Sequence, residues 1–255
     1  MRTENIKKFF EEGSYPDYAC PECKIGILRN TKLHKVISKK PPLFHEYNWM
    51  EEEEYYRDGK EHIFASVLKC SNNSCQQVVS MIGKFIEGYQ DCVEETGLTG
   101  RFSSYFPKYF YPNLKIFDYP ENLPIQLEEE INNSFALYYS DTNGSANKIR
   151  RAIELIVTNL GAPKFSLNKK TKRKNRKPLV LHERIVKLGK RKKRTSTMLL
   201  GLKIIGNEGS HFNELEIMNN DILEAYEVLE YILNKEFTNK EQEILLKAEN
   251  LKNRK

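Results

Sequence analysis

The chain has 255 residues and a formal net charge of +6, with 39% hydrophobic and 30% charged residues. This length allows two domains with separate cores, and the composition is too apolar and aromatic for a chain that is disordered throughout. Its apolar runs are too short for a membrane-spanning helix or for the core of a signal peptide. We therefore expect a cytoplasmic protein without membrane contacts.

The first predicted domain, residues 1–100, is organised around two close pairs of cysteines. The first pair is separated by two residues and followed by Gly26, and the second lies between the strand-like runs 63–68 and 78–82. Two thiolate pairs on two turns can fill a tetrahedral zinc shell, and a reducing compartment disfavours disulfides. We predict a small, β-rich zinc ribbon that holds a structural Zn²⁺, with four buried free thiols as the alternative. The predicted ligands are Cys20, Cys23, Cys70 and Cys75.

Three further features surround the cysteine pairs. Residues 5–12 have short helical character, and an insert between the pairs ends in the acidic run 51–54. Residues 101–121 are rich in aromatics but contain Pro107 and Pro112, which predicts an extended linker that packs between domains. A surface on which unpaired bases stack is the alternative for this segment.

From residue 122 to residue 238 the hydrophobic period becomes helical, and a polar helical tail is predicted at 239–255. Ser145 is a candidate cap for the second helix, and Gly161 is expected to end it. The predicted fold class is therefore α+β: a β-rich ribbon followed by an all-α bundle. The expected apolar stripes are Leu127, Ile131, Phe135 and Tyr138; Ile149, Ile153, Ile156 and Leu160; and Leu223, Tyr226, Leu229 and Leu233.

The positive charge is concentrated in residues 164–194, which we call the basic segment. It holds 15 lysines and arginines against one glutamate, a formal charge of +14 that leaves −8 for the other 224 residues. Such a segment is typical of a nucleic-acid contact, and a solvated loop without a ligand is the alternative. The candidate contacts are Lys169, Lys170, Lys172, Arg173, Lys174, Arg176, Lys177, Lys190, Arg191, Lys192, Lys193 and Arg194.

Three stretches carry a resemblance to a known family: PENLP (120–124), SANKIRRAIELIV (145–157) and LKIIGNEGSHF (202–212). The chain here resembles the helical domain that is appended to type I restriction subunits and found in prokaryotic defence proteins, a member of the HEPN superfamily. The resemblance implies a helical bundle, frequently dimeric, whose active members cut RNA without a metal. Those members use an arginine, a polar residue and a histidine at Arg-Asn-x-x-x-His spacing.

Carried onto this chain, the motif implies that Asn207 and His211 share one phosphate. Gly206 stands where active members have arginine, and Lys203 is the nearest upstream cation. A histidine can move the proton of a ribose 2′-OH while a cation stabilises the developing negative charge. For Asn207 and His211 the alternative is a scaffold role, in which His211 caps or pins the turn before the last helix. Arg150 and Glu154 are candidates for the same cleft, with an ordinary helix salt bridge as their alternative.

The sequence thus predicts a protein directed to nucleic acid, RNA more than DNA, in prokaryotic defence or stress. One form of this hypothesis is a metal-independent endoribonuclease, which can be homodimeric or act with a defence-system partner. The rival forms are a non-catalytic binding or adaptor module of a defence or restriction system and a protein scaffold with a solvated basic loop.

Overall fold

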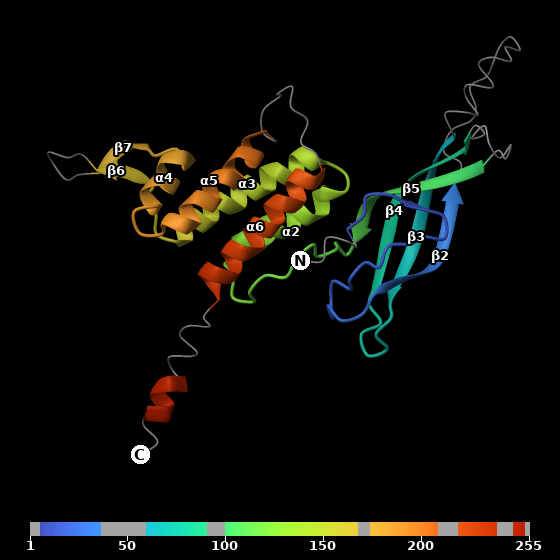
Figure 1. Cartoon of the computed structure of the whole chain (residues 1–255), viewed down its shortest axis with the longest axis horizontal. Helices are drawn as coiled ribbons and strands as arrows, with labels where there is room; N and C mark the ends of the chain where they lie inside the picture. Colours follow the sequence, from blue (N-terminus) through green and yellow to red (C-terminus); the bar gives the residue numbers. More distant parts are fainter. Residues whose placement is uncertain are drawn as a thin grey trace, which may run out of the picture. The chain divides into compact units, whose positions relative to one another are not determined.

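The computed structural model describes residues 6–36, 60–90, 100–167, 174–208, 219–238 and 247–252. The chain has mixed α+β structure, with an antiparallel sheet in its N-terminal half and helices in its C-terminal half (Figure 1). It divides into two compact units. Residues 2–115 and 135–140 form the sheet unit, and residues 116–134 and 141–255 form the helical unit. The predicted α+β class is confirmed.

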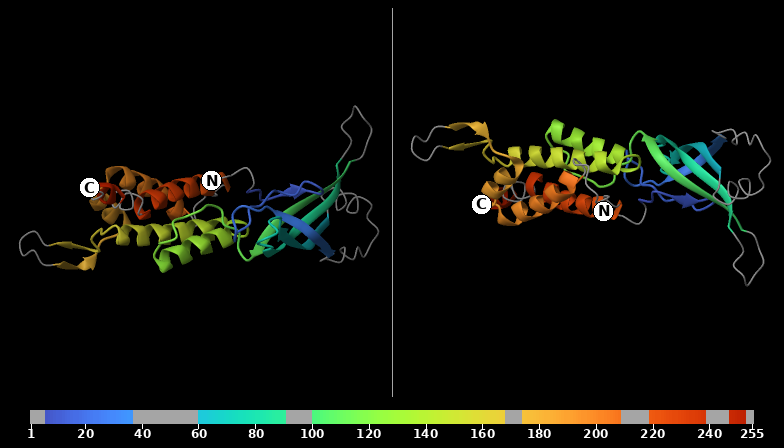
Figure 2. Two further views of the ribbon diagram at one scale, coloured as in Figure 1. Left: turned by 90° about the horizontal axis from the view of Figure 1, so that it is seen from below. Right: turned by 90° about the horizontal axis from the view of Figure 1, so that it is seen from above.

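The sheet unit is built on one five-stranded antiparallel sheet in the order β1-β5-β4-β3-β2, which curls as Figure 2 shows. Its strands are β1 (Phe10–Glu11), β2 (Leu28–Val36), β3 (Lys60–Cys70), β4 (Val78–Gln90) and β5 (Gly100–Tyr111). The prediction of helical character for residues 5–12 is wrong, because Phe10 and Glu11 pair with β5. The acidic run 51–54 lies outside the described residues.

Aromatic rings fill the inner side of the curled sheet. Tyr105 lies between Phe10 and Phe85, with ring centroids 5.1 and 5.4 Å away, and Phe64 meets it edge-on at 5.3 Å. All four side chains are buried. Offset and edge-to-face pairs at these distances add to the stabilisation that burial of the ring surface provides. The side chains alternate between inner and outer faces because successive residues of a strand point to opposite sides.

Most of the segment that the sequence assigns to an aromatic linker is strand β5. A proline inside a strand is tolerated at a bulge or at the edge of a sheet, and Pro107 lies at both. The pairing of β5 with β4 shifts between Ile82 and Gly83, where Pro107 lies opposite Gly83. The other neighbour, β1, pairs only with Tyr105 and Ser104, so this part of β5 is an edge. The segment is extended as expected, but it belongs to the sheet.

Among the described residues, five helices between residues 125 and 237 form the body of the helical unit (Figure 1), and their apolar stripes are largely buried. The helices are α2 (Ile125–Tyr138), α3 (Thr142–Asn159), α4 (Leu181–Leu188), α5 (Lys193–Glu208) and α6 (Asn219–Phe237). The last turn of α2 belongs to the sheet unit. Of the twelve stripe residues predicted from the helical period, Leu160 and Leu223 are half-buried and the others are buried. The period was therefore a correct guide to the core.

Ser145 does not cap α3 as predicted. The cap is Asp141, whose side chain accepts a hydrogen bond of 2.8 Å from the backbone N–H of Gly144. Ser145 lies one turn further and is buried in a hydroxyl cluster with Ser134 and Tyr226, at O–O distances of 2.8 to 3.1 Å. At the other end, Gly161 has φ +75°, the left-handed conformation that ends helices, as expected.

The helical unit is not all-α, because the basic segment contains a two-stranded antiparallel hairpin. Its strands are β6 (Phe165–Leu167) and β7 (Lys174–Pro178), and the hairpin extends beyond α4 in all views of Figures 1 and 2. Cations three or four residues apart repel on one face of a helix, whereas a strand sends neighbouring side chains to opposite faces. Pro178 also prevents a helix from continuing through the end of β7.

Residues 247–252 of the predicted tail are helical, and the rest of the tail lies outside the described residues. In the part of the chain that the structure describes, no helix combines the length and the apolar character needed to cross a bilayer.

Candidate functional site

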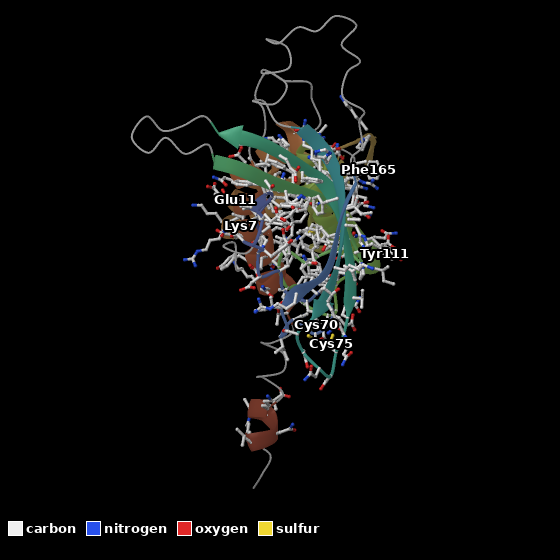
Figure 3. All side chains as sticks on the ribbon, turned by 90° about the vertical axis from the view of Figure 1, so that its right-hand side faces the viewer. Lys7, Glu11, Cys70, Cys75, Tyr111 and Phe165 are labelled. Atoms are coloured by element: carbon white, nitrogen blue, oxygen red, sulfur yellow. The ribbon has the colours of Figure 1, made fainter. Side chains whose placement is uncertain are left out.

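Two turns at one end of the sheet bring the four predicted ligands together (Figure 3). Cys20 and Cys23 lie in the turn before β2, which is closed by a bridge between Ala19 and Ile27. Cys70 ends β3, and Cys75 lies in the turn between β3 and β4. The turns meet because β2 pairs with β3, and this register sets Leu28 directly opposite Cys70.

The four sulfur atoms lie close enough together to surround one metal ion. All four Sγ atoms lie within 4.8 Å of one another. Cys20 Sγ is 3.8 Å from Cys75 Sγ, and Cys23 Sγ is 3.6 Å from Cys70 Sγ. A regular tetrahedron with Zn–S bonds of ~2.3 Å has edges of ~3.8 Å. Four thiolates leave no position for water, so the cluster is compatible with a structural metal.

The two turns have matching backbone frameworks. In each turn the residue after the second cysteine has positive φ, +59° at Lys24 and +53° at Gln76. Backbone N–H groups point to sulfur in both turns: Gly26 N is 3.4 Å from Cys23 Sγ, and Asn72 N is 3.4 Å from Cys70 Sγ. Such N–H groups hold a thiolate in place and orient its lone pairs toward the centre of the cluster.

Gly26 belongs to this framework because a side chain at its position would occupy the space of a ligand. A Cβ there would collide with Cys70 Sγ and lie 3.1 Å from the Asn72 backbone nitrogen. The two turns are also tied to each other. Ile27 N donates to Ser71 Oγ, and Ser71 N donates to the carbonyl of Ile27, both at 2.9 Å.

The thiols differ in acidity before any metal binds. Hydrogen bonds from the backbone N–H groups of Gly26 and Ile25 lower the pKa of Cys23 to about 6. Burial raises the pKa of Cys70 well above its ordinary value. A soft divalent cation that takes all four sulfurs as thiolates therefore releases protons when it binds.

Sequence reasoning found the four ligands and Gly26 but missed Asn72 and Ser71. Both lie inside the CSNNSC stretch. The signal available was the composition of that stretch, because Asn and Ser are typical of turns whose side chains bond to nearby backbone. The fifth cysteine, Cys92, lies outside the described residues.

The candidate residues of the helical unit gather where α5 crosses α3. Gly206 of α5 lies directly on Arg150 of α3: a Cβ at Gly206 would stand 2.7 Å from the Cβ of Arg150 and 3.2 Å from its Cα. Two further candidates are half-buried on the same helix: Lys203, three residues before Gly206, and Asn207, which follows it directly. The absence of a side chain at Gly206 thus allows the two helices to approach closely.

Arg150 and Glu154 form the helix salt bridge that was the alternative to a role in a cleft. Arg150 Nε lies 3.8 Å from Glu154 Oε1, and both side chains are partly exposed. A bridge of this length at the surface contributes little to stability, so both groups can turn to another charge. His211 lies outside the described residues, and so do Lys169, Lys170, Lys172 and Arg173.

The described cations of the basic segment fall into two groups. Arg191 donates to the carbonyls of Leu160 and Gly161 at the end of α3, and Lys192 lies 2.6 Å from Glu236. These two side chains therefore stabilise the fold. Arg184 and Lys187 are half-buried, and Arg184 donates to Thr158 Oγ1 at 2.7 Å. The remaining cations with described side chains are exposed and pair with no carboxylate of the described residues; they are Lys164, Lys177, Lys190, Lys193 and Arg194. Lys174 and Arg176 lie on β7.

These features define a two-part α+β protein with a four-cysteine cluster at one end of its sheet. Residues 8–114 match the family model of a domain of unknown function (DUF8608), which covers the whole cluster. Residues 132–254 match that of a second domain of unknown function (DUF4145), which covers most of the helical unit. The searches of curated proteins and of solved structures gave no match. Neither family description gives an activity, so function is argued from the residues.

Proposed function

We propose that the chain is an RNA-directed protein of prokaryotic defence or stress, in which a zinc-stabilised sheet unit accompanies a HEPN-like, RNA-binding helical unit. Zinc is the metal that suits the cluster, because four thiolates in a tetrahedral arrangement select zinc over hard cations. The metal stabilises the zinc-ribbon end of the sheet and takes no part in chemistry.

One observation carries the RNA-binding proposal: the first turn of α5 carries two exposed cations and no acid. Lys193 and Arg194 occupy that turn, and the exposed Lys190 precedes it. The backbone N–H groups of a helix N-terminus carry partial positive charge, so each cation there costs about 0.3–1 kcal/mol. Cations at a helix N-terminus oppose folding but favour a bound phosphate, which both the helix and the side chains attract.

The proposal is tested by a substitution that changes stability and affinity in opposite directions. K193Q/R194Q is expected to be slightly more stable than wild type and to bind single-stranded RNA more weakly. The matched control is K247Q/K252Q, which removes two exposed lysines from the C-terminal helical segment 247–252. Fluorescence anisotropy of a labelled RNA and urea unfolding measure the two quantities. Unchanged RNA affinity of K193Q/R194Q would contradict the proposal.

A second candidate, metal-independent endoribonuclease activity, is favoured by the contact between Gly206 and Arg150. In this hypothesis Arg150 supplies from α3 the guanidinium that the motif lacks before Asn207. Lys203 and Asn207 hold the phosphate, and His211 moves the proton of the attacking 2′-OH. Glu154 is the partner that Arg150 leaves when it turns to the phosphate, since their salt bridge is long and partly exposed.

Cleavage of a mixed labelled RNA pool in the presence of EDTA tests this candidate. The hypothesis predicts cleavage by wild type, loss of cleavage in H211A, and strong reduction in R150Q. Binding of the same RNA without any cleavage by wild type would support the rival, a non-catalytic adaptor module of a defence or restriction system. Equal cleavage by wild type and H211A would place the activity outside this protein's helical site.

A further inference from the structure

The outer face of the sheet exposes large apolar and aromatic side chains. Its inner face is buried, as described above, whereas the outward positions of β4 and β5 leave rings and branched side chains open. Tyr109 and Tyr111 are 62% and 82% exposed, and Ile82 is 47% exposed. Val78 and Ile63 are exposed to the same degree. Exposed apolar groups that gather on one face mark a binding surface.

The strand register sets these side chains side by side. Ile82 lies opposite Tyr109, and Ser80 lies opposite Tyr111, which is labelled in Figure 3. The two tyrosines are two residues apart on one strand, so they share a face at a spacing of ~7 Å. They form an open pair of rings with Ile82 and Ser80 beside them.

The charged residues of the strands indicate what kind of molecule the outer face binds. Residues 28–36, 63–70, 78–86 and 101–111 contain no aspartate or glutamate; the acids of β3 and β4, Glu61 and Glu87, lie at the ends of these strands away from the cysteines, and Asp17 pairs with Arg29 at 3.1 Å. Their cations are Arg29, Lys32, Lys35, Lys69, Lys84, Arg101 and Lys108. Lys32 and Lys69 are exposed at outward positions, opposite Val67 and Arg29 respectively. The sheet is therefore a second basic surface, separate from the basic segment.

We infer that this outer face binds single-stranded RNA, with unpaired bases stacked on Tyr109 and Tyr111 and phosphates near Lys69 and Lys32. Every base has a π face, so rings on a sheet accept bases in succession, while lysines attract the backbone. RNA fits this face because it combines open rings at Tyr109 and Tyr111 with the exposed cations Lys32 and Lys69, which match the bases and the phosphates of a single strand. The inference deepens the proposed RNA-directed function and depends on it.

The test separates stacking from simple apolar contact. Short labelled oligouridine RNA is titrated with wild type, Y109L/Y111L and Y109F/Y111F, and with Y231L as a control for an exposed tyrosine of α6. Leucine keeps apolar area but removes the ring, so Y109L/Y111L is expected to bind about tenfold more weakly or worse. The phenylalanine variant and Y231L are expected to bind like wild type.

Each other outcome has a defined meaning. If wild type binds RNA and Y109L/Y111L binds equally well, the inference fails and the proposed function stands. If wild type binds no RNA, both fail. Tighter binding of oligothymidine than of oligouridine, or loss of binding in the phenylalanine variant as well, would also overturn the inference. Zinc content and urea unfolding of each variant show that the sheet unit is folded.

Discussion

Substitution of Gly26 by alanine is the sharpest test of the metal cluster, because it adds one carbon atom beside a ligand and changes no sulfur. The new Cβ would lie nearer to Cys70 Sγ than the 3.0 Å below which an atom has to shift. It cannot move away toward Asn72, whose backbone nitrogen and Cβ are each 3.1 Å from it. The ligand therefore has to move.

The cluster leaves little room for such a movement. The sulfur pairs at 3.6 and 3.8 Å already match the ~3.8 Å edges of a zinc–thiolate tetrahedron. A displaced Cys70 lengthens one metal bond and disturbs the N–H contact from Asn72. Loss of a group that orients a ligand typically weakens metal binding by about 10–100-fold, and overpacking adds about 1–3 kcal/mol of destabilisation.

The assay is zinc content of the purified protein together with competition against a chelator of known affinity. G26A is expected to lose zinc at chelator concentrations that wild type withstands, and its sheet unit is expected to unfold at lower urea concentration. The matched control is I25A in the same turn, since Ile25 is 83% exposed and its loss should change stability by less than about 0.5 kcal/mol. Equal zinc affinity of G26A and wild type would refute the geometry of the cluster.

Three further predictions concern the helical unit. Y226F removes a buried hydroxyl that bonds to two serines, so urea unfolding should show a loss of about 1–2 kcal/mol, and an unchanged midpoint would count against the cluster. Glu236 is partly buried, which opposes ionisation, but hydrogen bonds from Lys192 and Thr195 lower its pKa below the ordinary 4.5. A lowered pKa contributes stability above pH 4.5, and this stability is lost as the pH falls through the pKa of Glu236 in the folded protein. E236Q should therefore be about 1 kcal/mol less stable than wild type at pH 7 and equally stable in acid. A difference in unfolding free energy that persists in acid would contradict this prediction. G206A should destabilise the helical unit by about 1–3 kcal/mol, because its new Cβ would press on Arg150. The Cβ of G201A, on the same helix, would meet no atom within 4 Å, so this variant should be more stable than wild type by up to about 1 kcal/mol. Equal effects of the two substitutions would exclude close packing at Gly206.

The sequence was most informative where the spacing of residues alone decides the structure. The apolar stripes of the helices could be predicted because the 3.6-residue period of a helix does not depend on how the helices pack. The cysteine pairs could be read because ligand spacing within a turn is fixed by the metal. Both signals are local, and the structure agrees with both.

Two of the errors come from pairing between distant segments, which no local pattern shows. Phe10 and Glu11 were assigned helical character because nothing nearby shows that they pair with β5. Pro107 and Pro112 predict an extended linker at 101–121, but nothing nearby in the sequence shows that this segment pairs with β4. The hairpin of β6 and β7 was hidden by its own cations, which are as typical of a solvated loop as of a strand.

The central claim, that the basic segment binds RNA phosphates, is tested most directly by the salt dependence of binding. Each phosphate contact contributes about 0.7 to the slope of log affinity against log salt for a single strand. The account predicts that K193Q/R194Q lowers the wild-type slope by about 1.4, while K247Q/K252Q leaves it unchanged. Equal slopes for wild type and K193Q/R194Q would contradict the claim.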